Sequence, residues 1–125
     1  MDKEFDDRMP IYLQIMDLIK KDIVTCKLKC GDKLPSVREM ATNLKVNPNT
    51  LQRSYQELER LEIVYTQRGM GTFVSDDITM VNTLKLEMAQ KIVDSFISQM
   101  KSLGFSENEI INSINLKIKE AKNNG

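Results

Sequence analysis

The sequence predicts a mostly α-helical fold with one small β-hairpin, arranged as two regions along the chain. Apolar residues recur at helical spacing in five stretches, and two short β-like runs lie between the third and fourth stretches. The pattern changes again after Asp76. We therefore expect a first domain at residues 1–76 and a second segment at residues 77–125.

The composition excludes several classes of protein. The 125 residues carry 18 Lys and Arg against 18 Asp and Glu, and they include no histidine, which removes histidine-based catalysis and histidine metal sites. Cys26 and Cys30 alone cannot complete a zinc site, so we expect no enzyme, no metal and no cofactor. The first ten residues do not resemble a signal peptide, and no apolar run approaches the ~18 residues of a membrane span. These features predict a cytoplasmic protein without a membrane partner.

The two cysteines leave two interpretations open. Their spacing of four residues at a helix end would suit a local redox pair, whereas ordinary unpaired thiols are the simpler interpretation in a cytoplasmic protein.

The zero net charge also matters for partners, because any nucleic-acid site must then be a local patch of positive charge.

Three helices are predicted in the first domain. Residues 10–25 have helical apolar spacing, with Tyr12 expected in the core. Ser36 and Glu39 form a capping box, in which each side chain bonds to the backbone amide of the other, so a second helix begins there. Asn47 is a good N-cap and Pro48 a good first residue for the third helix.

The third helix has two distinct faces. Its apolar stripe is Leu51, Tyr55, Leu58 and Leu61, and its opposite face carries Asn49, Gln52, Arg53, Gln56 and Arg60. Two helices joined by a tight turn, the second with a donor-rich outer face, are typical of a helix-turn-helix. Residues 63–66 and 72–74 then predict a hairpin whose connecting loop contains glycines, so the unit as a whole is predicted to be a winged helix-turn-helix.

The second segment has more apolar surface than it can bury by itself. Residues 80–103 form a predicted helix with two adjacent apolar rows, Gly104 ends it, and a shorter last helix starts after Ser106. Because the shorter helix cannot cover both rows, we expect a two-helix dimerisation segment and a homodimer, with any small-molecule effector at the seam between subunits. A chain ending at Asp77 should then be folded but monomeric. The residues expected in the dimer interface are Leu84, Met88, Ile92, Val93, Phe96, Ile97, Met100, Ile110 and Ile114.

The methionines of this segment allow a second interpretation. Methionine adapts its shape to irregular ligands, so the stripe would also suit a ligand pocket, although core or dimer packing is its more common use.

Several motifs, in order, resemble one family. They are Pro10-Ile11-Tyr12 with Gln14-Ile15, then Gly31-Asp32-Lys33-Leu34-Pro35-Ser36-Val37-Arg38-Glu39, then Val46-Asn47-Pro48-Asn49-Thr50 with Arg53 and Tyr55, and finally Gly69-Met70-Gly71-Thr72-Phe73-Val74. Over residues 10–75 they resemble the DNA-binding domain of the GntR family of bacterial transcription regulators, in particular its small YtrA-like branch. The resemblance implies a homodimer that binds a palindromic operator on double-stranded DNA. We expect a repressor, with activation left open.

The candidate DNA-binding residues fall in three places. Ser36 and Arg38 begin the second helix, where free amides and a guanidinium suit a phosphate, and this family places that arginine on DNA. The start of the third helix suits base edges in the major groove, and the loop glycines allow close approach to the backbone or minor groove. The residues in these two places are Asn47, Asn49, Thr50, Gln52 and Arg53 on the third helix, and Arg68, Gly69 and Gly71 in the loop.

Each of these sites also has an ordinary structural interpretation. Arg38 could pair with Glu39 or Glu57, a polar helix face is often only solvated, and the loop could be a plain hairpin turn. Gln52 stands where many branches of the family have arginine, which leaves the base preference open. A winged helix that binds another protein instead of DNA is the competing function.

Overall fold

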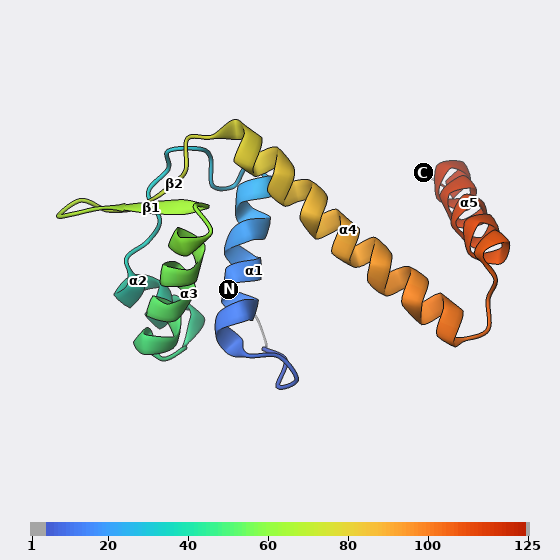
Figure 1. The fold of residues 1–125 in the computed structure, drawn as a ribbon, viewed down its shortest axis with the longest axis horizontal. Coiled ribbons are helices and arrows are strands. Elements are labelled where there is room, and N and C mark those ends of the chain that lie inside the picture. The colour runs from blue at the N-terminus through green and yellow to red at the C-terminus, as the bar shows by residue number, and fades with distance from the viewer. Residues whose placement is uncertain (1–4, 125) are drawn as a thin grey trace. The chain divides into compact units, whose positions relative to one another are not determined.

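The computed structural model describes residues 5–124 (Figure 1). In chain order its elements are α1 (Ile11–Val24), α2 (Val37–Leu44), α3 (Pro48–Arg60), β1 (Val64–Gln67), β2 (Gly71–Val74), α4 (Ile78–Ser102) and α5 (Glu107–Asn124). These residues divide into two compact units, the first ending at Lys85 and the second beginning at Leu86. Among residues 5–124, no helix combines the length and apolar character that a membrane crossing requires.

The core of the first unit lies between α1 and α3, with α2 packed against α3. Helix α1 contributes Ile15, Ile19 and Ile23 at the expected helical spacing, and α3 contributes Leu51 and Leu58. The arrangement confirms the predicted helix-turn-helix. Leu61 is the exception within the predicted stripe, because α3 ends at Arg60 and this side chain is exposed.

Local signals fix the ends of the two short helices. The Ser36 hydroxyl accepts a hydrogen bond from the Glu39 amide at 3.1 Å, and the Glu39 carboxylate accepts one from the Ser36 amide at 3.4 Å. The Asn47 side-chain oxygen accepts from the Asn49 amide at 2.8 Å, and Pro48 follows at the first helical position. Both predicted caps are confirmed. Between the helices, Lys45 adopts a left-handed conformation that makes the turn tight.

The wing is an antiparallel hairpin of β1 and β2, with Val64 opposite Val74 and Gln67 opposite Gly71. A third segment runs beside β2, where the Leu34 amide donates to the Thr72 carbonyl and the Val74 amide donates to the Asp32 carbonyl, each at 2.8 Å. The loop before α2 is thereby tied to the wing. This pairing was not predicted.

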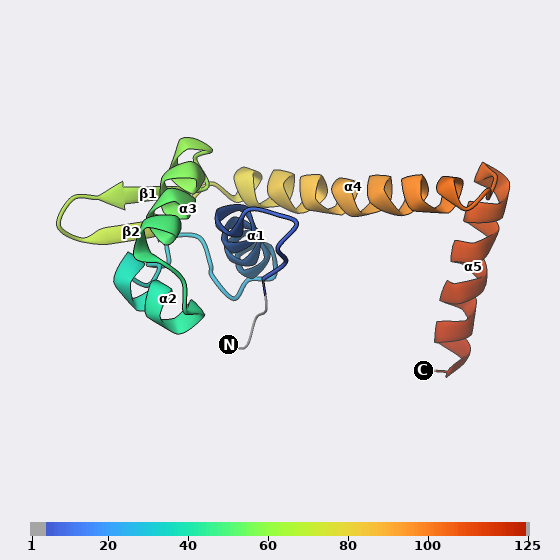
Figure 2. The ribbon, with the colours of Figure 1, turned by 90° about the horizontal axis from the view of Figure 1, so that it is seen from below.

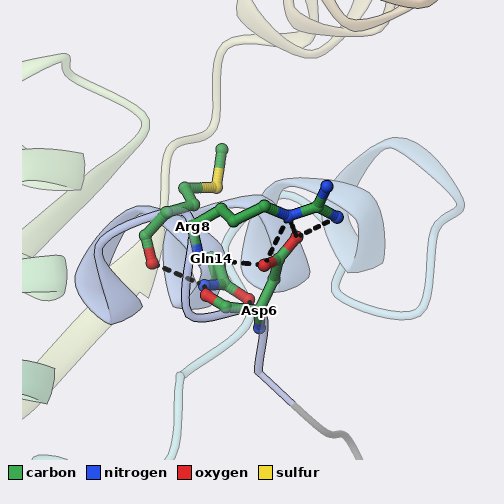
Figure 3. A network of polar contacts seen from close by, with 4 residues as sticks. Asp6, Arg8 and Gln14 are labelled. Carbon is green, nitrogen blue, oxygen red and sulfur yellow. Dashed lines mark hydrogen bonds and ion pairs between the residues drawn. The ribbon is translucent and has the colours of Figure 1, made fainter.

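The start of α1 is anchored by Gln14, which is buried and polar. Its side-chain nitrogen donates to the carbonyls of Asp6 and Met9, at 2.6 and 2.8 Å, and its side-chain oxygen accepts from the Asp6 amide at 2.8 Å (Figure 3). Asp6 also forms an exposed ion pair with Arg8, which lowers the pKa of the Asp6 carboxyl. Residues 6–9 are therefore folded onto the first turn of α1.

The first turns of α4 belong to the first unit. Val81 and Leu84 are only 9% and 5% exposed, and Figures 1 and 2 show this part of α4 beside α1. The compact first unit thus extends past residue 76, where we expected it to end. Leu84, which we expected in the dimer interface, is covered within this first unit and has little surface left for a partner.

The second unit consists of the rest of α4 and α5, joined by a tight turn. Gly104 has a φ of 92° and ends α4 in a Schellman motif, in which the Phe105 amide donates to the Met100 carbonyl and the Gly104 amide to the Lys101 carbonyl. Ser106 and Glu109 then form the predicted capping box. The Ser106 amide, which donates to the Glu109 carboxylate at 2.9 Å, and secondarily the Ser106 side chain lower the pKa of Glu109.

The second unit has almost no core of its own. Of its described apolar side chains only Ile110 is buried, at 4% exposure, so this residue too has little surface to offer a partner. Met88, Ile97 and Met100 are half-buried. The large exposed apolar side chains are Leu86, Ile92, Val93, Phe96, Leu103, Phe105, Ile111, Ile114, Leu116 and Ile118.

Candidate nucleic-acid interface

The N-terminus of α2 combines backbone amides with an exposed arginine. The capping box engages Ser36 and Glu39, and Arg38 projects from the same turn with an exposed side chain. Glu57 pairs with Arg60 at 2.8 Å, and no ion pair among residues 5–124 involves Arg38. The alternative pairings of Arg38 with Glu39 or Glu57 are therefore absent from the described chain. This guanidinium is available to an anion at the positive end of a helix.

The first turns of α3 present Asn49 and Gln52 outward, where both side chains are exposed. Asn47 plays a different part, since its side-chain oxygen is occupied by the cap. Thr50 is half-buried, and its carbonyl accepts a hydrogen bond from Ser54 at 3.3 Å. Of the predicted polar residues in these turns, Asn49 and Gln52 are thus the two whose amide groups remain open to a ligand.

Arg53 is exposed, and its guanidinium contacts an aromatic ring. Its guanidinium carbon lies 3.8 Å from the centre of the Tyr12 ring, within the range of a cation–π contact. Tyr12 was expected in the core, but its side chain is half-buried and forms a platform at the start of α1. No periodic pattern could have predicted this contact, because the two residues lie on different helices.

Tyr55 ties α3 to the residue that precedes the cap of α2. Its hydroxyl donates to the Pro35 carbonyl at 2.7 Å, and its side chain is buried. Burial, and secondarily the negative charge of Glu39, raise the pKa of Tyr55 above its usual value. The hydroxyl therefore stays protonated and keeps the two helices of the motif in fixed register.

Two cations lie at the wing: Arg68, which we expected from the sequence, and Lys33, which we did not. Arg68 is exposed near the tip, and Gly69 and Gly71 have φ values of 80° and 125°, as the loop requires. The side chain of Lys33 crosses Gly71, where an added Cβ would lie 2.7 Å from the Lys33 Cε. Lys33 reaches the wing because residues 31–34 pair with β2, a contact between distant segments that the sequence pattern did not reveal.

Several cations near the helix-turn-helix are exposed and have no acidic partner in the described chain. Arg60 of α3 is paired with Glu57, but five other exposed cations, from the segment beside β2, from α2, from the turn after it, from α3 and from the wing loop, take part in no ion pair within residues 5–124. They are Lys33, Arg38, Lys45, Arg53 and Arg68. Unpaired cations close to a helix-turn-helix are suited to contacts with phosphate.

A tight pair of short helices, an outward donor-rich α3 and a glycine-turned wing define a winged helix-turn-helix DNA-binding protein. Residues 11–74 match the family described as bacterial regulatory proteins, gntR family, and the chain belongs to this family. The resemblance noted from the sequence is thereby confirmed. The family is one of transcription regulators, which also confirms that the chain is not an enzyme.

Relatives match nearly the whole chain. The HTH-type transcriptional regulator YhcF of Bacillus subtilis is 49% identical, with 91% of this chain and 94% of the relative covered. The HTH-type transcriptional repressor YtrA of the same organism is 38% identical, with 92% of each covered. The chain is therefore a YtrA-like member of the family.

Solved structures agree with this assignment. A GntR family transcriptional regulator from Listeria monocytogenes matches with a TM-score of 0.82 and 46% identity, covering 89% of this chain and 97% of the other. The DNA-binding domain of AraR, solved in complex with its operator ORX1, matches with a TM-score of 0.53 and 25% identity, covering 60% and 92%.

Proposed function

We propose that this DNA-binding regulator is a homodimer that represses transcription from a palindromic operator. The observation that carries the proposal is the second unit, whose described part buries one large apolar side chain and exposes many. Two helices with so little core are not stable in water, and a second copy is the simplest cover. The repressor YtrA supports the direction of regulation, and operator binding by AraR supports the DNA site.

The proposed dimer interface differs from the residues that the sequence suggested. Its centre is the exposed row of Ile92, Val93 and Phe96 on α4, with Ile114 of α5. Met88, Ile97 and Met100 stand at its edges because they are half-buried. Leu84 and Ile110 support the fold instead, because both are covered within the chain. We place any small-molecule effector at the seam between subunits, and the regulator in the cytoplasm, where its operator lies.

Sedimentation of a charged variant tests the dimer. Phe96→Glu places a charge in the proposed interface and should convert a micromolar dimer into a monomer. Ser98→Glu on the same helix, outside the two apolar rows, is the matched control and should leave the dimer intact. Loss of one of two linked sites lowers affinity by about 10²–10⁴-fold, so Phe96→Glu should bind a full operator far more weakly and a half-site almost unchanged. A monomeric wild-type protein at micromolar concentration contradicts the proposal.

The DNA site is proposed to separate phosphate binding from base reading. Arg38 binds phosphate, together with the amides after Ser36, while Arg53 reads a guanine and Asn49 or Gln52 an adenine. The wing, with Arg68, Gly69 and Gly71, approaches the backbone or minor groove. Asn47 and Thr50 act by shaping the start of α3.

Two arginine variants test this division of roles on operators selected from a random duplex pool. Arg53→Ala should lose about 1–3 kcal/mol of discrimination at one position, because a bidentate base contact is lost. Arg38→Ala should weaken all duplexes alike and reduce the slope of affinity against salt concentration by about one. Equal loss of specific and random binding in Arg53→Ala contradicts base reading. Binding to random duplex that does not depend on salt would instead favour a protein partner.

A further inference from the structure

We propose that Tyr12 is a positioning residue for base recognition, which acts by holding the Arg53 guanidinium against its ring. This inference rests on the proposed function, because it adds a second residue to the base-reading role of Arg53. It concerns a residue of α1, outside the helix-turn-helix itself.

The contact with the ring leaves the guanidinium exposed. A guanidinium carbon 3.8 Å from the ring centre places the cation over the aromatic face, where the ring's negative potential attracts it. The N–H groups of arginine lie in the guanidinium plane and point outward from its edge. Because Arg53 is exposed, these groups can still form a bidentate pair with a base.

The backbone beneath the Tyr12 ring is held from two sides. The hydroxyl of Ser54, which is fully buried, donates to the Tyr12 carbonyl at 2.9 Å and joins the first turn of α1 to α3 next to Arg53. Gln14 holds residues 6–9 against the same turn (Figure 3). The backbone that carries the half-buried Tyr12 side chain is thus held by contacts that do not involve Arg53.

Holding Arg53 in place favours specificity over general affinity. An exposed arginine samples many rotamers, and fixing it when it meets a base costs conformational entropy. A guanidinium already held by the ring loses less freedom on binding, so the base pair that it reads is discriminated more strongly. A cation–π contact at an exposed site corresponds to about two- to five-fold in binding, and this is the expected loss of discrimination without the ring.

A double-mutant cycle on the full chain tests the proposal, with competition binding between the selected operator and versions changed at each position. Tyr12→Leu removes the ring but keeps apolar bulk, Tyr12→Phe keeps the ring, and Arg53→Ala removes the guanidinium. Ile11→Ala, which shortens the preceding side chain in the same turn, is the control for general disturbance of α1. Thermal unfolding of each variant is measured in parallel.

The expected result is a loss of about two- to five-fold for Tyr12→Leu, confined to the position that Arg53→Ala also affects. Tyr12→Phe should restore wild-type discrimination, Ile11→Ala should leave it unchanged, and Tyr12→Leu should add no loss in the Arg53→Ala background. The proposal is overturned if the two losses add independently, if Tyr12→Phe behaves like Tyr12→Leu, or if Tyr12→Leu weakens all duplexes equally. It is also overturned if Arg53→Ala changes no position while the wild type still prefers its operator. A wild type with no operator preference refutes the proposed function itself.

Discussion

Leu84 and Ile92 occupy equivalent places in one apolar row of the sequence, yet the structure gives them different surroundings. Leu84 is 5% exposed within the first unit, and Ile92 is 71% exposed in the second. We predict that Leu84→Ala destabilises the first unit by about 2–5 kcal/mol, since a buried leucine is lost and a cavity remains. Ile92→Ala should leave that unit unchanged and weaken the dimer by about 1–3 kcal/mol instead.

The tyrosines provide an assay specific to the first unit. All three, Tyr12, Tyr55 and Tyr65, lie before Lys85, so the tyrosine band of near-ultraviolet circular dichroism and tyrosine fluorescence report on that unit. For a domain of this size, a loss of 2 kcal/mol or more lowers the unfolding midpoint by at least about 8 °C. Sedimentation of the same samples gives the dimer dissociation constant.

The two measurements should respond oppositely in the two variants. Leu84→Ala should lower the midpoint and keep most of the dimer, whereas Ile92→Ala should keep the midpoint and weaken the dimer. If Leu84→Ala dissociates the dimer without changing the tyrosine signal, then Leu84 faces a partner, and the reasoning from its burial is wrong. The same reasoning predicts that truncation at Asp77 destabilises the first unit, because Val81 and Leu84 are removed from it.

Two further predictions concern the first unit. Gly71→Ala should cost about 1–3 kcal/mol, and more than Gly69→Ala, because the φ of 125° at Gly71 lies further from the left-handed region that other residues tolerate than the 80° at Gly69. The flexible Lys33 side chain can move away from an added Cβ, so it contributes little to the loss. Chemical unfolding of both variants checks this, and equal losses would contradict the reasoning from φ. Tyr55→Phe should cost about 1–2 kcal/mol, since the Pro35 carbonyl loses its donor. The folded pKa of Tyr55 is raised, so its contribution is complete below about pH 10 and declines as the pH rises further, because the unfolded chain ionises first. Unfolding followed from pH 8 to pH 11 should therefore show less alkaline loss in Tyr55→Phe, and identical profiles would contradict this assignment.

The features that the sequence predicted well are local ones. The capping box of Ser36 and Glu39 and the N-cap of Asn47 depend on residues two or three positions apart, so the pattern contains the interaction itself. The turn after α4 was predictable for the same reason, because Gly104 can adopt the positive φ that a Schellman motif needs.

The features that escaped prediction all join segments far apart in the chain. Periodicity assigned Leu84 and Ile92 to one stripe because it records the face of a helix, not the object packed against each turn. Tyr12 was assigned to the core because aromatic residues on an apolar face usually lie there, and only the packing of α1 on α3 places it beside Arg53. Lys33 likewise reached the wing only through pairing of its own segment with β2.

Arg38 and Arg53, the two arginines of the proposed DNA site, differ in the contacts that they make within the protein. A phosphate has several equivalent oxygens, so a mobile guanidinium near a helix N-terminus is sufficient, and Arg38 has no ion-pair partner among residues 5–124. A base edge offers two acceptors in one plane, so the arginine that reads it benefits from a fixed orientation. Arg53 has such an orientation through the ring of Tyr12. In the proposed division of roles, the contacts that each arginine makes within the protein thus favour phosphate binding for Arg38 and base reading for Arg53.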